Sequence, residues 1–291
     1  YQTMLKNIGS IENQGYELSI ESDNLTGAFS WTTAFNIAFN RNKVLELGGE
    51  EYKEMAEGDG HLKTGSVRRL IVGEPIGVFY GYRFDGIFQN EEECKQQTSS
   101  ASPIGVGLRR YKDLNGDGKV DAANDREILG DANPKFFGGL TNTFAYKGFE
   151  LNVFLQYSYG NKILNYNAME LENPTGGQNA YADMVNRWTP ENPYSEGPRT
   201  WDRENQYWIN NDNTYFMRNA NYLRLKNIEL GYTFNFEGLK KAGISNLRLY
   251  TNGTNLITID GVKDADPEQR DASLGGYPLR KIINFGVQAT F

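Results

Sequence analysis

A loop rich in oxygen ligands is the sharpest chemical pattern in the chain. Residues 113–125 read DLNGDGKVDAAND. Oxygen-bearing side chains at the first, third and fifth positions, followed by glycine, match the start of an EF-hand calcium loop. The predicted ligands are Asp113, Asn115, Asp117, the Lys119 carbonyl, Asp121 and Asp125. Bound Ca²⁺ would rigidify the loop. Because Asp125 comes one residue after the expected final ligand, a metal-free turn held by Asp and Asn side chains stays open as the alternative.

No arrangement for catalysis accompanies this loop. The glutamate runs at 50–51 and 91–93 are typical of a solvated surface. His61, the only histidine, lies in a polar stretch with no serine or cysteine beside it, so neither a catalytic triad nor a zinc site can be assembled. The single cysteine, Cys94, excludes an internal disulfide. The sequence therefore predicts a protein that is not an enzyme.

Aromatic side chains gather between 186 and 216 among Asn, Arg and Asp residues. Flat rings beside amides and carboxylates suit sugar rings, whose C–H faces stack on them while the hydroxyls form hydrogen bonds. The same rings could pack together inside an ordered loop or contact a second protein. The candidates for substrate or partner contact are Trp188, Trp201, Tyr207, Trp208 and Tyr215.

The elements that position these loops are long segments in which apolar and polar residues alternate. Between 28 and 40 the odd positions are mostly aromatic or apolar, and the even positions are small or polar. The pattern recurs at 15–22, 149–160, 222–235 and 281–291 and more weakly at 136–146, while 247–258 alternates poorly and is placed by its neighbours. Such lengths suit membrane strands of roughly 9–11 residues better than soluble strands of about 5–6.

The polar faces of these strands are expected to line a wet interior. The residues concerned are Glu17, Glu21, Asn36, Asn152, Gln156, Asn227, Glu229, Asn284 and Gln288. The alternation by itself does not say which face contacts lipid.

Short and long connections alternate between the strands, as in outer-membrane barrels. The turns at 24–27 and 147–148 are tight, whereas 161–221 is long. If the last strand ends in the periplasm, 161–221, 259–280 and most of 43–134 lie outside the cell. Strand parity then allows either no strand or two strands between 43 and 135, with 76–84 and 107–113 as the candidates.

Composition narrows the class of protein. The 291 residues carry a formal net charge of −7, which argues against a nucleic-acid partner. No run of 18 apolar residues exists, so no helix of the chain is expected to span a bilayer. Tyr1 and the absence of a signal peptide predict that the chain is part of a longer precursor.

Eight short sequence segments occur along the chain in an order that is typical of one protein family. They are NIGSIENQGYELSI (7–20), GVFYGYRFDGIF (77–88), DLNGDGKVD (113–121), GDANPKFFGGL (130–140), NRWTPENP (186–193), YLRLKNIELGYTF (222–234), LRLYTNGTNLIT (247–258) and YPLRKIINFGVQATF (277–291). Together they resemble the C-terminal part of the SusC/RagA family of TonB-linked outer-membrane proteins of Bacteroidetes. The resemblance covers nearly the whole chain.

The resemblance implies an all-β fold, the C-terminal part of a 22-strand transmembrane antiparallel β-barrel with long extracellular loops. Residues 1–291 would form one barrel segment, and the plug and the TonB-contacting segment would lie in an N-terminal remainder. With about 7–9 strands the segment cannot close a large barrel alone. The implied partners are a SusD-like surface lipoprotein, the TonB complex, the N-terminal remainder and lipid, at the outer membrane.

The implied function is TonB-dependent import of a nutrient. An oligosaccharide is the favoured substrate and a peptide is the alternative within the family. A calcium-stabilised glycan-binding or adhesion module with no transport role is the alternative from another class.

Overall fold

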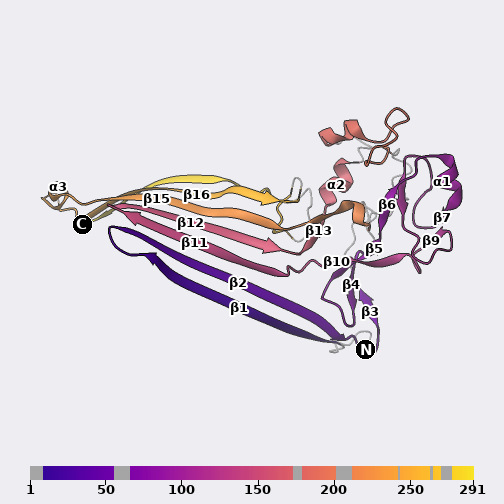
Figure 1. Ribbon diagram of the computed structural model, residues 1–291, viewed down its shortest axis with the longest axis horizontal. Helices are drawn as coiled ribbons and strands as arrows, with labels where there is room; N and C mark the ends of the chain where they lie inside the picture. The colour runs from indigo at the N-terminus through magenta and orange to yellow at the C-terminus, as the bar shows by residue number, and fades with distance from the viewer. Residues whose placement is uncertain are drawn as a thin grey trace, which may run out of the picture.

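The chain folds into a long curved wall of strands joined to a head of short strands and helices (Figure 1). The computed structural model describes residues 9–55, 66–172, 179–200, 212–241, 243–262, 265–269 and 277–291. The C-terminus lies at the tip of the wall that is farthest from the head. None of the helices in the described ranges is long and apolar enough to cross a membrane.

Seven antiparallel strands form the wall, in the order β1-β2-β11-β12-β15-β16-β17. Their bounds are β1 (Ser10–Leu25), β2 (Phe29–Glu46), β11 (Phe136–Tyr146), β12 (Phe149–Tyr159), β15 (Tyr222–Phe234), β16 (Asn246–Asp260) and β17 (Ile282–Thr290). Each predicted alternating segment is one of these strands. The predicted all-β barrel architecture is therefore confirmed.

The structure also decides how many wall strands lie between 43 and 135. β2 pairs directly with β11, from Phe137 opposite Ala38 to Tyr146 opposite Phe29. None of the described residues between β2 and β11 enters the wall, so the alternative of no strand holds. The candidate segments 76–84 and 107–113 instead contribute short strands to the head.

Short connections lie at one end of the wall and long ones at the other. The turn between β11 and β12 has positive φ at both Lys147 (+45°) and Gly148 (+86°), which is the geometry of a type I′ hairpin. A short helix, α3 (Glu237–Lys241), joins β15 to β16 at the same end (Figure 1). The long connections all meet the head.

A bulge explains the weak alternation of the segment at 247–258. Asn255 of β16 has φ +54°, and the register with β15 shifts between Leu225 and Asn227. The left-handed turn brings Leu256 over Gly253, where a Cβ would lie 2.5 Å from a Leu256 methyl carbon. An apolar side chain therefore covers the place where the strand itself carries glycine.

The head contains a four-stranded sheet in the order β10-β5-β4-β3. Its strands are β3 (Tyr52–Glu54), β4 (Arg68–Ile71), β5 (Val78–Tyr82) and β10 (Arg126–Gly130). Three pairs of short strands surround it: β6 (Phe84–Ile87) with β8 (Arg109–Tyr111), β7 (Thr98–Ser99) with β9 (Lys119–Val120), and β13 (Lys162–Leu164) with β14 (Met217–Asn219). The helices are α1 (Glu91–Gln96), α2 (Tyr166–Leu171), η1 (Ala182–Asn186) and η3 (Thr214–Phe216).

One hydrophobic core joins the two long regions that connect the wall strands. Val67, Phe79 and Leu129 come from the first region, and they pack against residues of the second. The second set is Leu164, Ala168, Met169, Phe216 and Met217. Burial of these side chains offsets the entropy of ordering two long insertions, so both fold together as one body.

Candidate functional site

The outer face of the wall carries a belt of aromatic rings near the tight turns. Phe144 stacks on Trp31 with ring centroids 5.8 Å apart and on Phe29 at 6.4 Å. Farther along the sheet, Tyr232 contacts Phe149 at 4.5 Å and Phe234 at 4.7 Å. These residues come from four neighbouring strands and point to the same side.

A second belt lies at the head end of the same face. Phe136 contacts Tyr159 at 5.1 Å, Phe39 at 5.8 Å and Tyr157 at 6.3 Å. Phe136 and Tyr146 are separated by ten steps along β11, about 34 Å of strand. At a tilt of roughly 40° this corresponds to about 26 Å, close to the apolar band of about 25 Å in outer-membrane barrels.

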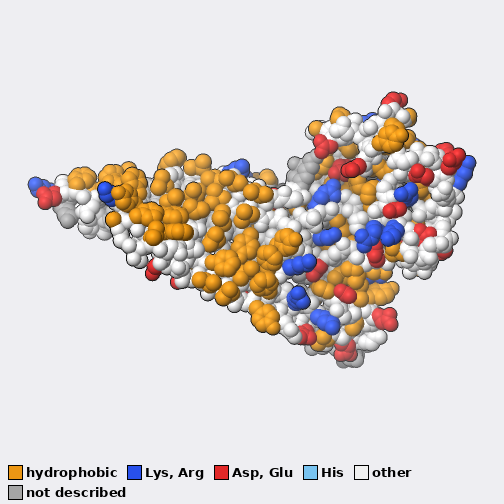
Figure 2. All heavy atoms as spheres, viewed as in Figure 1, with side chains coloured by type: hydrophobic (Ala, Val, Ile, Leu, Met, Phe, Trp, Pro, Cys, Tyr) orange, Lys and Arg blue, Asp and Glu red, His pale blue; other side chains and the backbone are white. Residues whose placement is uncertain are grey.

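Between the belts the outer face is apolar and uncovered (Figure 2). Ile20 is 49% exposed and Ile283 62%. A contiguous apolar surface of this extent is unfavourable in water and favourable against lipid.

The inner face is polar and cross-linked. Arg248 of β16 pairs with Glu229 at 2.9 Å and with Glu150 at 3.0 Å. Asn152, Glu229, Asn252 and Asn284 stand opposite one another across four strands. The strand register places all nine predicted lining residues on this face, opposite the aromatic belts.

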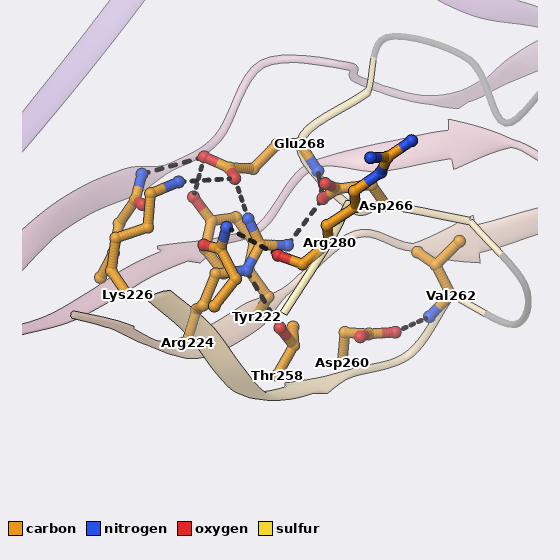
Figure 3. Close-up of polar contacts among 11 residues, drawn as sticks. Tyr222, Arg224, Lys226, Thr258, Asp260, Val262, Asp266, Glu268 and Arg280 are labelled. Carbon is orange, nitrogen blue, oxygen red and sulfur yellow. Dashed lines mark hydrogen bonds and ion pairs between the residues drawn. The ribbon is translucent and has the colours of Figure 1, made fainter. Parts of the chain in front are cut away.

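A buried arginine organises the head end of the inner face (Figure 3). The Arg224 side chain of β15 is 1% exposed. It donates to Asp266 at 2.7 Å and to the Thr258 hydroxyl at 3.0 Å, and it forms an ion pair with Glu268. Because a buried guanidinium without partners would be strongly destabilising, the two carboxylates hold the segment 265–269 against the wall.

The Glu268 carboxylate collects further donors from the wall. Tyr222 donates its hydroxyl at 3.1 Å, and Lys226 lies 3.3 Å away (Figure 3). The Gln156 amide also donates to this carboxylate, at 3.0 Å. A recess of about 540 Å³ opens beside this cluster, lined by Gln156, Tyr222, Glu268 and Lys162 among others. Charged and polar groups therefore gather where the inner face of the wall meets the head.

The head contains its own groove of about 950 Å³, which includes Tyr215 in its lining. Phe84 meets the Tyr215 ring edge-on at 5.0 Å. Arg218 and Glu172, also in the lining, form an ion pair at 3.4 Å. Burial, followed by the charge of Glu172, raises the pKa of Tyr215, so its hydroxyl stays neutral and can donate a hydrogen bond.

Trp188, the other predicted contact residue that is described, is packed inside the head. It is 9% exposed, and its ring leaves no room for a side chain at Gly107, where a Cβ would lie 2.5 Å from the indole. Its environment matches the packing alternative, although the indole N–H has no partner among the described residues. Trp201, Tyr207 and Trp208 lie outside the described residues.

The predicted calcium loop is closed by hydrogen bonds from its own backbone. Asp113 accepts from the N–H groups of Gly116 and Gly118, both at 2.7 Å. Asn115 and Asp117 each accept from the N–H two residues later, at 3.1 and 2.8 Å. These are Asx turns, and they place the oxygen atoms of the three side chains around one short loop.

The end of the loop is held by two further aspartates. Asp125 is fully buried and accepts from Leu114 at 2.8 Å and from Asp121 at 2.7 Å. The side chain of Lys119, followed by the Asn124 backbone, lowers the pKa of the Asp121 carboxyl by hydrogen bonding. Within the described ranges no three His, Cys, Asp or Glu side chains gather closely enough to hold a metal. Calcium binding therefore stays a prediction.

The Arg224 cluster and a second buried ion pair in the head were not predicted from the sequence. Arg126 and Asp212 pair at 2.9 Å, with side chains 11% and 7% exposed. Burial raises the pKa of Asp212 to about 7 in spite of the Arg126 charge. An arginine at an inward-facing position of β15 was a visible signal, but no local pattern indicated its partners in a distant loop.

The sequence of this chain is similar to those of several known receptors. No protein-family model matches the chain. It is 38% identical to TonB-dependent receptor P3 and 31% identical to TonB-dependent receptor P26, both from Formosa agariphila, over 99% and 100% of its length. It is 27% identical to TonB-dependent receptor SusC of Bacteroides thetaiotaomicron over 99% of its length. The chain spans 30%, 30% and 27% of those proteins.

The RagAB peptide transporter shares the fold, with a TM-score of 0.78 at 22% identity over 98% of this chain and 30% of the transporter chain. The alternating strands, the paired aromatic belts and these likenesses define part of an outer-membrane β-barrel. The chain belongs to the SusC/RagA family of TonB-dependent receptors, in which it corresponds to the C-terminal portion of the barrel. These relatives are named as receptors and a transporter rather than as enzymes.

Proposed function

We propose that this chain supplies part of the barrel wall and an extracellular head of a TonB-dependent importer that takes a nutrient across the outer membrane. The observation that carries the proposal is the two-sided wall, apolar and belted by aromatic rings outside and polar inside. A wall of this kind separates lipid from a water-filled path. The tight turns would face the periplasm and the head would face the outside.

The favoured substrate is an oligosaccharide. The head groove combines the rings of Phe84, Tyr181 and Tyr215 with carboxylate and guanidinium groups, which suits the stacking and hydroxyl pairing of sugars. A peptide is the second candidate, since the charged pair of Glu172 and Arg218 in the same groove could also contact a peptide backbone or its charged ends.

A SusD-like lipoprotein above the head and the TonB complex, acting through an N-terminal remainder, complete the proposed assembly. The lipoprotein would hold substrate against the head groove, and energy from TonB would open the path along the inner face. The Arg224 cluster borders that path and ties down one of the loops that surround it.

Import by cells is the direct test. Cells lacking the full-length gene should fail to take up a labelled oligosaccharide, and the wild-type gene should restore uptake. Tyr215→Ala should reduce uptake because it removes a ring from the groove, whereas Tyr194→Ala, at a tyrosine that is 92% exposed and outside that lining, should not. Equal uptake with and without the gene for both oligosaccharides and peptides would contradict the proposal.

The loop at 113–125 is proposed to bind Ca²⁺ as a structural ion. Asp113, Asn115 and Asp117 would supply side-chain oxygens, and Asp121 would have to exchange its contact with Lys119, now at 3.0 Å, for the metal. Calorimetric titration of the full-length protein should show binding that Asp117→Ala abolishes. Unchanged titration curves in that variant would place any bound ion elsewhere.

A further inference from the structure

Three cations border the head-side aromatic belt and form no ion pair with the described residues. Arg41 and Lys43 follow Phe39 in β2 at two-residue steps, so strand alternation keeps them on the outer face. Lys135 directly precedes Phe136. All three side chains are exposed, and none forms an ion pair within the part of the chain that the structure describes.

This lack of an ion pair distinguishes the three cations from the two arginines of the inner face. Arg224 and Arg248 are each bound by two carboxylates. Both point to the inner face, where a solute passes. Arg41 and Lys43, which face the other side of the wall, are therefore left available to something that approaches from outside the barrel.

The three cations line one recess of about 680 Å³ between the end of β2 and the segment before β11. Two carboxylates share this recess. Asp131 already accepts from the backbone and side chain of Asn133 at 2.9 and 2.7 Å, and Glu12 accepts from Gln14. Three cations against two carboxylates leave the recess with a net positive charge of one.

The position of the recess indicates which kind of chemical group it can bind. It adjoins the aromatic belt of Phe39 and Phe136, where the apolar face of the wall ends. Figure 2 shows Lys and Arg side chains gathered along the line where this apolar face meets the head. In a membrane, rings at such a border lie at the level of the lipid headgroups, and cations just beyond them reach the headgroup charges.

We propose that this recess binds the phosphate-bearing headgroup of an anionic lipid of the outer leaflet, with the acyl chains lying on the Phe39 and Phe136 belt. The inference rests on the proposed membrane orientation. Arginine and lysine supply charge-assisted hydrogen bonds to phosphate oxygens. The Gln14 and Asn133 amides line the same recess and add polar groups around the site.

The test uses the full-length protein in phosphatidylcholine nanodiscs, with and without added diphosphorylated lipid A, and counts retained lipid by native mass spectrometry. A triple variant, Arg41→Gln, Lys43→Gln and Lys135→Gln, should bind lipid A at least about tenfold more weakly than wild type. Each cation near an anionic headgroup is worth about 1 kcal/mol, or roughly fivefold, so three set an upper bound of about a hundredfold.

The matched control removes three cations of the head away from the wall, by Arg83→Gln, Lys95→Gln and Lys112→Gln, and should retain lipid A like wild type. Equal retention by all three proteins would overturn the inference. Competition by millimolar inorganic phosphate as effective as lipid A would identify a phosphate site rather than a lipid site and would also overturn it. A protein that does not insert into nanodiscs would instead contradict the proposed membrane orientation, which separates the two failures.

Discussion

At the scale of single residues, Asp212 is expected to make the stability of the head depend on pH. Burial raises its pKa in the folded protein to about 7, against about 3.9 in an unfolded chain. The folded state therefore holds this proton more tightly. Its contribution is fully present below about pH 4 and is lost as the pH rises through 7, by an amount on the order of 2–4 kcal/mol.

Hydrogen exchange of β5 and β10 amides, measured between pH 5 and pH 8 and corrected for intrinsic exchange rates, would show this loss. Asp212→Asn should flatten the dependence because the amide does not titrate, while Asp85→Asn, an exposed carboxylate of the head, should leave it in place. A wild-type head that is equally stable at both pH values would contradict the prediction.

Arg224 gives a second prediction at this scale. Arg224→Ala removes the partner of Asp266 and Glu268 and should loosen the 265–269 segment by about 3 kcal/mol, since carboxylates would be left near the wall without a counter-charge. Limited proteolysis or hydrogen exchange of that segment is the measurement. Arg83→Ala breaks a more exposed pair with Glu127 and should cost less than about 1 kcal/mol.

At the scale of elements, the exposed ring that follows β17 is expected to affect assembly into the membrane. Phe291 is 88% exposed and follows β17, so its removal costs little packing within this chain. Deletion of Phe291 should nevertheless impair insertion into the outer membrane if this ring contributes to the lipid-facing apolar surface beside β17, which fractionation of cells would show. Deletion that leaves the membrane-inserted amount unchanged would refute this role, and Phe236→Ala at an exposed ring outside the strands serves as the control.

At the scale of the whole molecule, the open wall predicts a requirement for further strands. β1 and β17 each have one neighbour in the seven-stranded sheet, so each leaves a row of backbone groups that lipid cannot satisfy. The full-length protein in detergent should migrate differently on a gel before and after heating, as closed barrels do. The isolated 291 residues should show no such shift, and a shift from them alone would contradict the requirement.

The period-2 pattern determined six of the seven wall strands and which of their residues share a face, because side-chain direction in a strand is set within a few residues. Boundaries followed closely, as at β11 and β12, since the turn at Lys147 and Gly148 is also a local signal. The order of the short sequence segments along the chain sufficed to indicate the family. Even the weak segment at 247–258 was placed correctly by its neighbours.

Only the tertiary structure decided what the long connections become. The contact of Arg224 with Asp266 joins residues 42 apart, and that of Tyr111 with Asn213 joins residues 102 apart. No periodicity links such positions, because their meeting depends on the paths of whole loops. Strand alternation, by contrast, is local, so the sequence by itself predicted which residues share each face of the wall. The shared core of the head and the cation-lined recess at its border emerged only from the fold.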